Sequence, residues 1–321
     1  MPPVQVLSNE KQDLINLPVL TRPYSQSAAP SHSALASLSA AVCSSAFLHP
    51  LDLIKTRLQV FSATRGAIPH YKGTVYAIWS IYSSEGYRGL YRGLSATVIA
   101  SGVSWGIFRY LFDFTRNAIH SSSTHGVSKS SPISLYENMV SSIIATIIAT
   151  SLVHPLWFIK TRMELQSFES KLVGWTQYKG WMHCCKTIYI QEGYHAFYKG
   201  FFAALWMAPH SIIQLVLYEE LKKRHNISAA SSMQLFWPFL WGVSSKFIAA
   251  SFTYPFQVLR SRLQMLHSPY ANYSLLQTIY KIWKTDGSIA FYRGFWTHIQ
   301  RASFQSGILF LLFEIFQKKL S

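Results

Sequence analysis

The residues of this 321-residue chain most able to do chemistry are cations inside apolar stretches. Arg301 lies within an apolar stretch near 295–316, and Lys246 interrupts another near 235–259. A charge at such depth needs a partner of opposite sign, and the planar fork of arginine suits phosphate or carboxylate. Lys246 either lines a cavity or extends toward an interface, and its depth favours the cavity. The chemistry that these residues indicate is anion binding.

Motifs for covalent chemistry are missing from the sequence. It holds no GxxxxGK[ST] loop to cradle phosphates, no GxGxxG and no HExxH. The three cysteines include no CxxC pair, so no disulfide framework and no metal site are expected. We therefore expect a protein that is not an enzyme and uses no cofactor. The enzyme alternative, a membrane-bound transferase using His and Arg, would need a paired carboxylate site or a metal cluster.

One unit of roughly a hundred residues occurs three times in the chain. Its first part reads HPLDLIKTRLQ from His49, HPLWFIKTRMEL from His154 and YPFQVLRSRLQ from Tyr254. Its second part reads EGYRGLYRG from Glu85, EGYHAFYKG from Glu192 and DGSIAFYRG from Asp286. Three copies in the same order predict three similar structural units.

Six apolar stretches of roughly 20 residues, the length that a bilayer core requires, accompany these motifs. They lie near 34–54, 93–115, 136–159, 200–221, 235–259 and 295–316. Each odd stretch continues through the proline of its motif, which we expect to kink the helix. Basic residues gather in the three long loops, as the positive-inside rule describes. Amphipathic segments such as 71–86 predict short helices at the membrane surface.

These features predict an all-α membrane protein with three tandem repeats, six transmembrane helices and three short amphipathic helices around a central cavity. The expected boundaries are a disordered tail at 1–33 and repeats at 34–118, 135–223 and 235–320. The net charge of +16 also fits a basic, membrane-associated binding protein. No zinc spacing or RNA-binding aromatic motif accompanies the charge, so nucleic acid is not an expected partner.

From about residue 34 onward the chain resembles the mitochondrial carrier family. The family motif is Pro-x-[Asp/Glu]-x-x-[Lys/Arg], followed by [Asp/Glu]-Gly-x4-aromatic-[Lys/Arg]-Gly, in three copies. The second part matches in all three copies, whereas the first part departs at Trp157 and Gln257, where an acid is expected. The family's bracing glutamine follows the proline by nine residues, and Glu164 replaces it in the second repeat.

The resemblance implies a matrix-side gate built from the three proline motifs. Asp52 is expected to pair with Lys160, Trp157 to form a cation–π contact with Arg260, and Gln257 to hydrogen-bond Lys55. The expected gate residues are Pro50, Asp52, Lys55, Gln59, Pro155, Trp157, Lys160, Pro255, Gln257, Arg260 and Gln264.

The resemblance also implies a cytoplasmic-side gate where the even spans end, in the motif aromatic-[Asp/Glu]-x-x-[Lys/Arg]. Asp113 is expected to meet Lys222, Glu314 to meet Arg116, and Glu219 to meet only Gln317. Arg109 is either a cavity charge or an extra gate contact. The expected gate residues are Asp113, Arg116, Glu219, Lys222, Glu314 and Gln317.

By resemblance, the substrate binds thirteen residues before each cytoplasmic gate acid, a helical distance of about 20 Å. Arg301 is expected to bind its anionic part. The alternative, a structural pair between Arg301 and a gate acid, is disfavoured by the distance to both gates. Helix–helix contact is an equal alternative for Gln214. The expected substrate-binding residues are Arg301, Lys246, His210, Gln214, Trp206, Met207, Ala100, Ser104 and Trp105.

Local features narrow the resemblance to the flavin and folate carriers, with pyrimidine-nucleotide and NAD carriers as relatives. These features are the HPLWFIKTR and YPFQVLRSRLQ segments, SWG at 104–106 and Lys246. They imply transport of FAD across the mitochondrial inner membrane by alternating access. Folate, NAD and pyrimidine nucleotides remain alternatives, because 207–209 departs from the folate type. A monomer is implied, with membrane lipid such as cardiolipin as a partner and both termini toward the intermembrane space.

Overall fold

The structure, a computed structural model, describes residues 30–63, 71, 73–123, 135–167, 174, 176–224, 236–270, 273–305 and 308. The chain divides into two compact units, Ser45–Ser306 and a unit formed by Met1–Ser44 with Gly307–Ser321. Of the second of these units, the described part is the beginning of one helix and residue 308. The site lies within Ser45–Ser306.

Long helices form where the sequence predicts apolar spans, and the described elements include no strand. They are α2 (Pro30–Val60), α4 (Leu94–Ser123), α5 (Leu135–Glu164) and α10 (Phe236–Gln264), with a further helical segment at 295–305. Pro50, Pro155 and Pro255 each lie inside their helix, as predicted. The kinks expected there stay a prediction.

The start of α2 overlaps the end of the predicted tail. The tail was expected to run to residue 33, but the helix begins at Pro30. Proline suits a helix's first position, because its fixed φ is helical and its missing N–H would have had no partner there. The rest of the predicted tail, 1–29, lies outside the described residues.

The fourth apolar stretch, near 200–221, forms two helices separated by a turn. α8 (Phe201–Leu205) ends in turns at 206–209, and α9 (His210–Arg224) begins after them. Pro209 explains the break, because proline disfavours helical geometry at the residue before it and cannot donate a backbone hydrogen bond. Trp206 and Met207 therefore lie in a turn.

Three short helices lie in the loops between odd and even spans, as predicted. They are α3 (Thr74–Leu90), α7 (Trp181–Glu192) and α11 (Leu275–Asp286). Each exposes large apolar side chains, Trp79, Ile190 and Trp283 among them. An exposed apolar face is what a helix lying at a membrane surface presents. One-turn 3₁₀ helices complete the fold at η1 (Phe61–Ala63), η2 (Tyr194–Tyr198) and η3 (Ser288–Tyr292).

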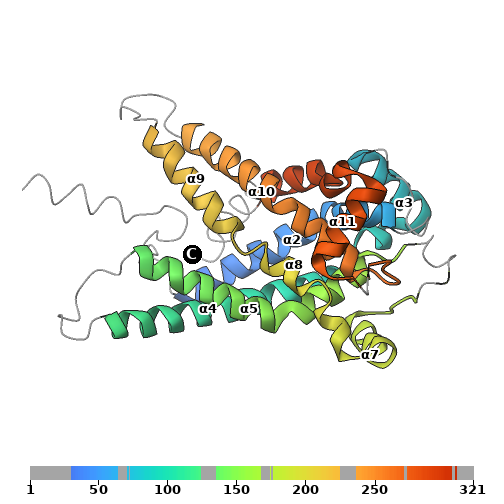
Figure 1. Cartoon of the computed structure of the whole chain (residues 1–321), viewed down its shortest axis with the longest axis horizontal. Coiled ribbons are helices and arrows are strands. Elements are labelled where there is room, and N and C mark those ends of the chain that lie inside the picture. The colour runs from blue at the N-terminus through green and yellow to red at the C-terminus, as the bar shows by residue number, and fades with distance from the viewer. Residues whose placement is uncertain are drawn as a thin grey trace, which may run out of the picture. The chain divides into compact units, whose positions relative to one another are not determined.

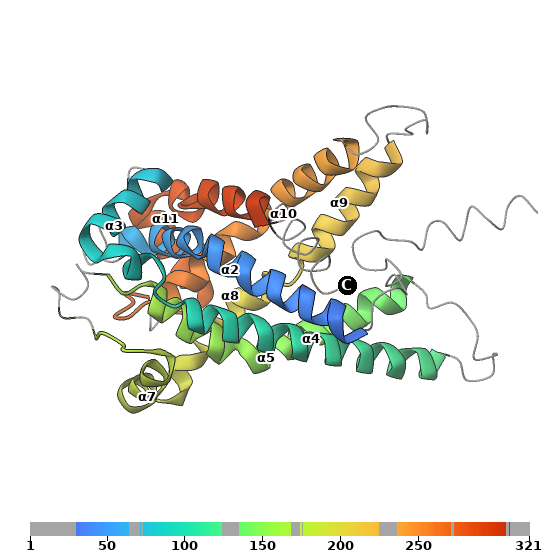
Figure 2. The same cartoon turned by 180° about the vertical axis from the view of Figure 1, so that it is seen from behind.

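Within this unit α4 runs beside α5 and α9 runs beside α10, in both Figure 1 and Figure 2. The short helices α3, α7 and α11 lie toward the same end of it (Figure 1). One buried cluster at that end joins α2, α3, α10 and α11 through Leu53, Ile81, Leu259 and Ile282. By length and composition, two stretches of the described residues could cross a membrane, Glu137–Glu164 and Tyr194–Lys223.

Candidate functional site

Each proline motif ends in a buried arginine that pairs with the acid of its own repeat's second motif. Arg57 Nη1 lies 2.7 Å from Glu85 Oε1, Arg162 Nη2 lies 2.9 Å from Glu192 Oε2, and Arg262 Nη1 lies 2.7 Å from Asp286 Oδ2. These pairs fasten each short helix to the long helix before it. Burying a charge is costly unless it is paired, so each pair depends on both partners.

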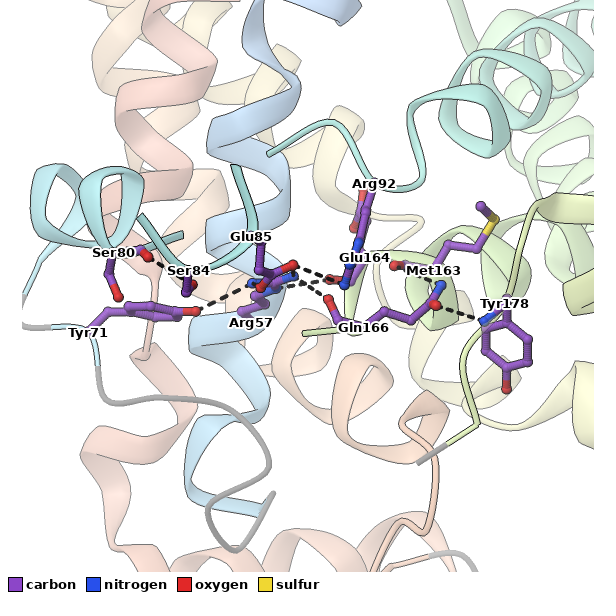
Figure 3. A network of polar contacts seen from close by, with 10 residues as sticks. All are labelled: Arg57, Tyr71, Ser80, Ser84, Glu85, Arg92, Met163, Glu164, Gln166 and Tyr178. Atoms are coloured by element: carbon purple, nitrogen blue, oxygen red, sulfur yellow. Dashed lines mark hydrogen bonds and ion pairs between the residues drawn. The ribbon is translucent and has the colours of Figure 1, made fainter. Parts of the chain in front are cut away.

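Arg57 also ties the first repeat to the second. Its Nε donates to the backbone oxygen of Glu164 at 3.2 Å, and its Nη2 donates to the backbone oxygen of Gln166. Figure 3 shows the guanidinium between Glu85 and the chain around Gln166. Arg262 repeats this contact, because its Nε donates to the backbone oxygen of Gln59 at 3.1 Å.

The acid of the second motif binds a second cation in the first two repeats. Arg92 Nη1 lies 2.9 Å from Glu85, and Lys199 Nζ lies 2.7 Å from Glu192. Burial by itself would raise the pKa of Glu192, but the charges and hydrogen bonds of Arg162 and Lys199 hold this pKa below its ordinary value of 4.5. Glu192 is therefore ionised throughout the physiological pH range.

Hydroxyl groups link the three repeats in a closed ring. Thr56 donates to Glu164 Oε2 at 2.8 Å, Thr161 donates to Gln264 Oε1 at 2.9 Å, and Ser261 donates to Gln59 Oε1 at 2.6 Å. The acceptors lie at the family's bracing positions. The ring runs from repeat one to two, from two to three and from three back to one.

The residue before each proline joins the two motifs of its repeat. The Nε2 atoms of His49 and His154 lie 2.9 and 3.2 Å from the backbone oxygens of Arg92 and Lys199, and Tyr254 donates to the backbone oxygen of Arg293 at 2.8 Å. Both histidine Nε2 atoms must carry a proton to donate to these oxygens.

The glycine that closes each second motif lies against another repeat. A Cβ at Gly200 would come within 3.3 Å of the Arg260 backbone oxygen, and one at Gly294 within 3.2 Å of the Lys55 backbone oxygen. Both glycines also have positive φ, at 77° and 81°. Close contact between repeats therefore explains why these motifs end in glycine.

Two of the three expected cross-repeat gate contacts are present. Lys160 Nζ lies 3.9 Å from Asp52 Oδ2, and the Arg260 guanidinium lies 5.9 Å from the centre of the Trp157 ring. Lys160 also lies over this ring, at 5.0 Å. The expected bond from Lys55 to Gln257 is wrong, because Gln257 Oε1 is buried and accepts no hydrogen bond from the described residues.

Arg301 contacts a gate acid, which the sequence analysis disfavoured. Its Nε lies 2.5 Å from Asp52 Oδ1, an ionic contact without the alignment of a hydrogen bond. The distance expected between Arg301 and the gates was counted in helical turns. It did not include the length of the arginine side chain, which reaches Asp52. Asp52 thus lies between Lys160 of the second repeat and Arg301 of the third. The carboxylate of the matrix gate and the expected substrate-binding cation are direct neighbours.

Of the other expected substrate residues, some contact neighbouring helices. His210 Nδ1 lies 2.9 Å from Thr253 Oγ1, so it joins α9 to α10. Lys246 and Gln214 are half-buried on α10 and α9. Met207 is half-buried in the turn between α8 and α9. Trp206, beside it, is largely exposed and stacks on Phe256, with ring centres 5.7 Å apart and planes 13° apart.

The expected residues on α4 separate into a buried and an exposed group. The Ala100 side chain is fully buried, so it offers no surface to a substrate in this conformation, contrary to expectation. Its small methyl group packs where the helices approach. Ser104 accepts a hydrogen bond from Trp157 Nε1 at 2.9 Å, which links it to the proline motif of repeat two. Trp105 is exposed and touches Phe108 edge-on.

Of the expected cytoplasmic gate, only the pair of Asp113 with Lys222 lies wholly within the described residues, and it is not formed. Asp113 contacts Arg109 at 2.9 Å and Arg116 at 3.5 Å, both on its own helix, and makes no ion pair with Lys222. The expected Asp113–Lys222 pair is therefore wrong for this conformation, because cations three and four residues away on one helix are always within reach. Arg109 was expected to be either a cavity charge or an extra gate contact. Its contact with Asp113 agrees with the second of these roles. Glu314 and Gln317 lie outside the described residues.

Sequence reasoning missed the three arginines that end the proline motifs. The signal was available, because KTR, KTR and RSR recur together with the acids of the second motif. Of the cysteines, Cys184 is buried, Cys185 is half-buried and Cys43 is exposed. Burial raises the pKa of the Cys184 thiol to about 12, and it packs against Phe158 and Ile188. Among the described residues, no cluster of three or more His, Cys, Asp or Glu could hold a metal ion.

Three helical repeats joined by a ring of motif contacts define a carrier of the mitochondrial type. The family model described as mitochondrial carrier protein matches three segments, 26–123, 131–227 and 231–321. The chain belongs to this family, which is one of transporters and not of enzymes.

Similar proteins include carriers of several cofactors. The chain is 33% identical over 281 residues to the chloroplastic folate transporter 1 of Arabidopsis thaliana, covering 84% of this chain and 89% of the relative. It is 31% identical over 278 residues to the mitochondrial nicotinamide adenine dinucleotide transporter 1 of Saccharomyces cerevisiae, covering 84% and 72%. It is 26% identical over 304 residues to the mitochondrial FAD carrier protein of the same yeast, covering 89% and 96%.

Proposed function

We propose that the protein carries a nucleotide-like cofactor, with FAD as the first candidate, across the mitochondrial inner membrane by alternating access. The observation that carries the proposal is the position of Arg301, half-buried beside the gate carboxylate Asp52. The names of the relatives support this class of substrate, because folate, NAD and FAD all combine flat rings with carboxylates or phosphates.

The charge around Arg301 favours a cargo with several negative charges. Lys246 is close enough to Arg301 for their charges to interact, and Lys55 is close enough to interact with both Asp52 and Arg301. Asp52 is shared between Arg301 and Lys160, so cations outnumber acids here. Phosphate groups on the cargo would neutralise this excess positive charge, and arginine binds them with two parallel hydrogen bonds.

The stacked pair of Trp206 and Phe256 suits the flat part of the same cargo. The exposed indole of Trp206 offers a ring face, and aromatic rings stack on heterocycles in offset geometry. A cofactor that has both a phosphate group and a flat ring would bind with its phosphate near Arg301 and its ring near Trp206.

In this proposal the cross-repeat contacts of the proline motifs form the matrix gate. Substrate binding can open the gate only by as much as the substrate prefers the opened state. The three basic loops face the matrix under the positive-inside rule, and six spans place both termini in the intermembrane space. The chain works as a monomer in contact with membrane lipid, cardiolipin included.

Liposomes containing the purified protein test the substrate. We expect uptake of FAD, and parallel assays with folate, NAD and pyrimidine nucleotides identify any other cargo. NAD and folate are tested as alternative cargoes. The relatives named for them are more similar to this chain than the FAD carrier is. If folded protein takes up none of these compounds, the proposed class of substrate is wrong.

Variants of Arg301 test the site. Arg301→Ala is expected to abolish uptake while the protein remains folded, and Arg301→Lys to retain part of it as a point charge. Arg88→Ala serves as the matched control, because Arg88 is an exposed arginine on α3 that belongs to neither expected gate nor to the expected substrate site. Full uptake by Arg301→Ala would contradict the proposed site.

A further inference from the structure

Two departures from the carrier motif occur together in the second repeat. Trp157 replaces the acid that follows the proline by two residues, and Glu164 replaces the bracing glutamine seven residues later. Residues seven apart lie two turns apart on the same face of α5. The repeat thus lacks a carboxylate at one position of this face and has one at another.

The hydrogen bond that Glu164 accepts does not by itself require a carboxylate. Its Oε2 accepts from Thr56 at 2.8 Å, and in the other two repeats glutamine oxygens accept the equivalent bonds from Thr161 and Ser261. A neutral amide therefore serves this purpose twice in the same ring. A charge at Glu164 needs another reason.

The second oxygen of Glu164 supplies that reason. Its side chain is 1% exposed, and Oε1 lies 3.4 Å from Lys160 Nζ without any hydrogen bond from the described residues. A buried carboxylate is costly unless a cation compensates it. Lys160 is the cation in reach, and it lies 3.9 Å from Asp52 on its other side. Figure 3 shows the position of Glu164 beside the Arg57 network.

We propose that Glu164 is an additional carboxylate of the matrix gate, two turns along α5 from Trp157, which stands where an acid is expected. It holds Lys160 from the matrix side while Asp52 holds it from the first repeat. The aromatic ring of Trp157 is then free to bind Arg260 and to donate its Nε1 hydrogen to Ser104. Glu164 acts as a positioning residue, through Lys160. This inference rests on the proposal that the proline-motif contacts are a gate, and it is independent of which cofactor is carried.

Glu164→Gln separates the two roles, because it keeps the acceptor for Thr56 and removes only the charge. We expect the Tm of the purified protein to fall by about 3 °C. A residue that served only as a brace would leave the Tm unchanged, since Gln59 and Gln264 perform that role as amides. The matched control, Thr56→Val, removes the hydrogen bond and keeps the charge, and we expect a smaller fall.

A double-mutant cycle with Lys160→Met identifies the partner. If Glu164 acts through Lys160, Glu164→Gln produces little further fall in Tm once Lys160 has been replaced. Additive losses from the two substitutions would overturn the proposal. These Tm measurements use no substrate, so they can be interpreted even if the FAD transport assay fails.

Discussion

The two predicted gates of this carrier differ in where their charged residues find partners. At the proline motifs Asp52 contacts Lys160 and Arg301, which belong to two other repeats, and all three side chains are largely buried. At the other gate Asp113 contacts Arg109 and Arg116 on its own helix, and its side chain is 37% exposed. The structure therefore has the contacts between repeats formed at the proline motifs, while the expected Asp113–Lys222 pair is unmade.

This difference shows that a charge can be held within one helix or between repeats. Arg109 and Arg116 remain near Asp113 in any conformation of α4, because they lie four and three residues away on the same helix. Asp52 has His49 and Lys55 three residues away on its own helix, but its ion pairs are with Lys160 and Arg301 of the other repeats.

The largest expected effect is from Arg57→Ala. This substitution leaves Glu85, 1% exposed, without its buried partner and removes the donor to the backbone at Glu164 and Gln166. Breaking a buried pair costs about 3–5 kcal/mol, so we expect protein that fails to fold or melts far below wild type. The thermal transition of purified protein measures this. Wild-type stability in the variant would show that the proline-motif contacts are not what holds the repeats together.

Asp52→Asn is expected to have the next largest effect. The amide keeps the shape of the side chain but leaves Arg301 and Lys160 without their shared carboxylate. We expect a lower Tm and severely reduced uptake, because the gate no longer closes. Asp113→Asn is the matched substitution at the other gate. Equal loss of Tm from both substitutions would contradict the contrast between the gates.

A smaller effect is expected from acid pH through Glu192. Its pKa is lower in the folded protein than in the unfolded chain, so its contribution to stability is complete above 4.5 and is lost as the pH falls through the folded-state pKa. Glu192→Gln should therefore lower the Tm at neutral pH and reduce the difference from wild type below pH 4.5. A difference that does not change with pH would show that the Glu192 charge is not the cause.

The smallest expected effect is from Asp113→Asn on its own. Arg109 is 67% exposed, and exposed ion pairs contribute about 0–1 kcal/mol. We expect a change in unfolding free energy within about 0.5 kcal/mol, together with a change in transport if this acid closes the other gate during the cycle. Thermal unfolding and uptake measured on the same preparation separate the two effects. A large fall in Tm would show that Asp113 has a buried partner.

Threefold repetition made most of the gate predictable from sequence. The resemblance to the carrier family implied the pairs Asp52–Lys160 and Trp157–Arg260, and the structure has both contacts. The three helices that contain the motif prolines and the three short surface helices were predicted because each motif occurs at the same position of its repeat. The closed ring of hydroxyl donors was not predicted, because the pairing of Thr and Ser with a bracing residue depends on the register between repeats.

The wrong predictions depend on features that residue spacing along one helix does not reveal. The Arg301–Asp52 contact was disfavoured because the distance was counted in helical turns, whereas an arginine side chain reaches across the space between helices. The break at 206–209 depends on Pro209, whose effect was not weighed against the apolar pattern of the span. Gln257 was assigned to Lys55 by analogy with the other pairs, but nothing in its own chemistry required that contact.

Uptake of FAD by liposomes containing the purified protein tests the account most directly. We predict saturable uptake by wild type, none by Arg301→Ala and full uptake by the control Arg88→Ala. A folded wild-type protein that moves neither FAD nor folate, NAD or a pyrimidine nucleotide would contradict the account, as would an Arg301→Ala variant that transports as well as wild type.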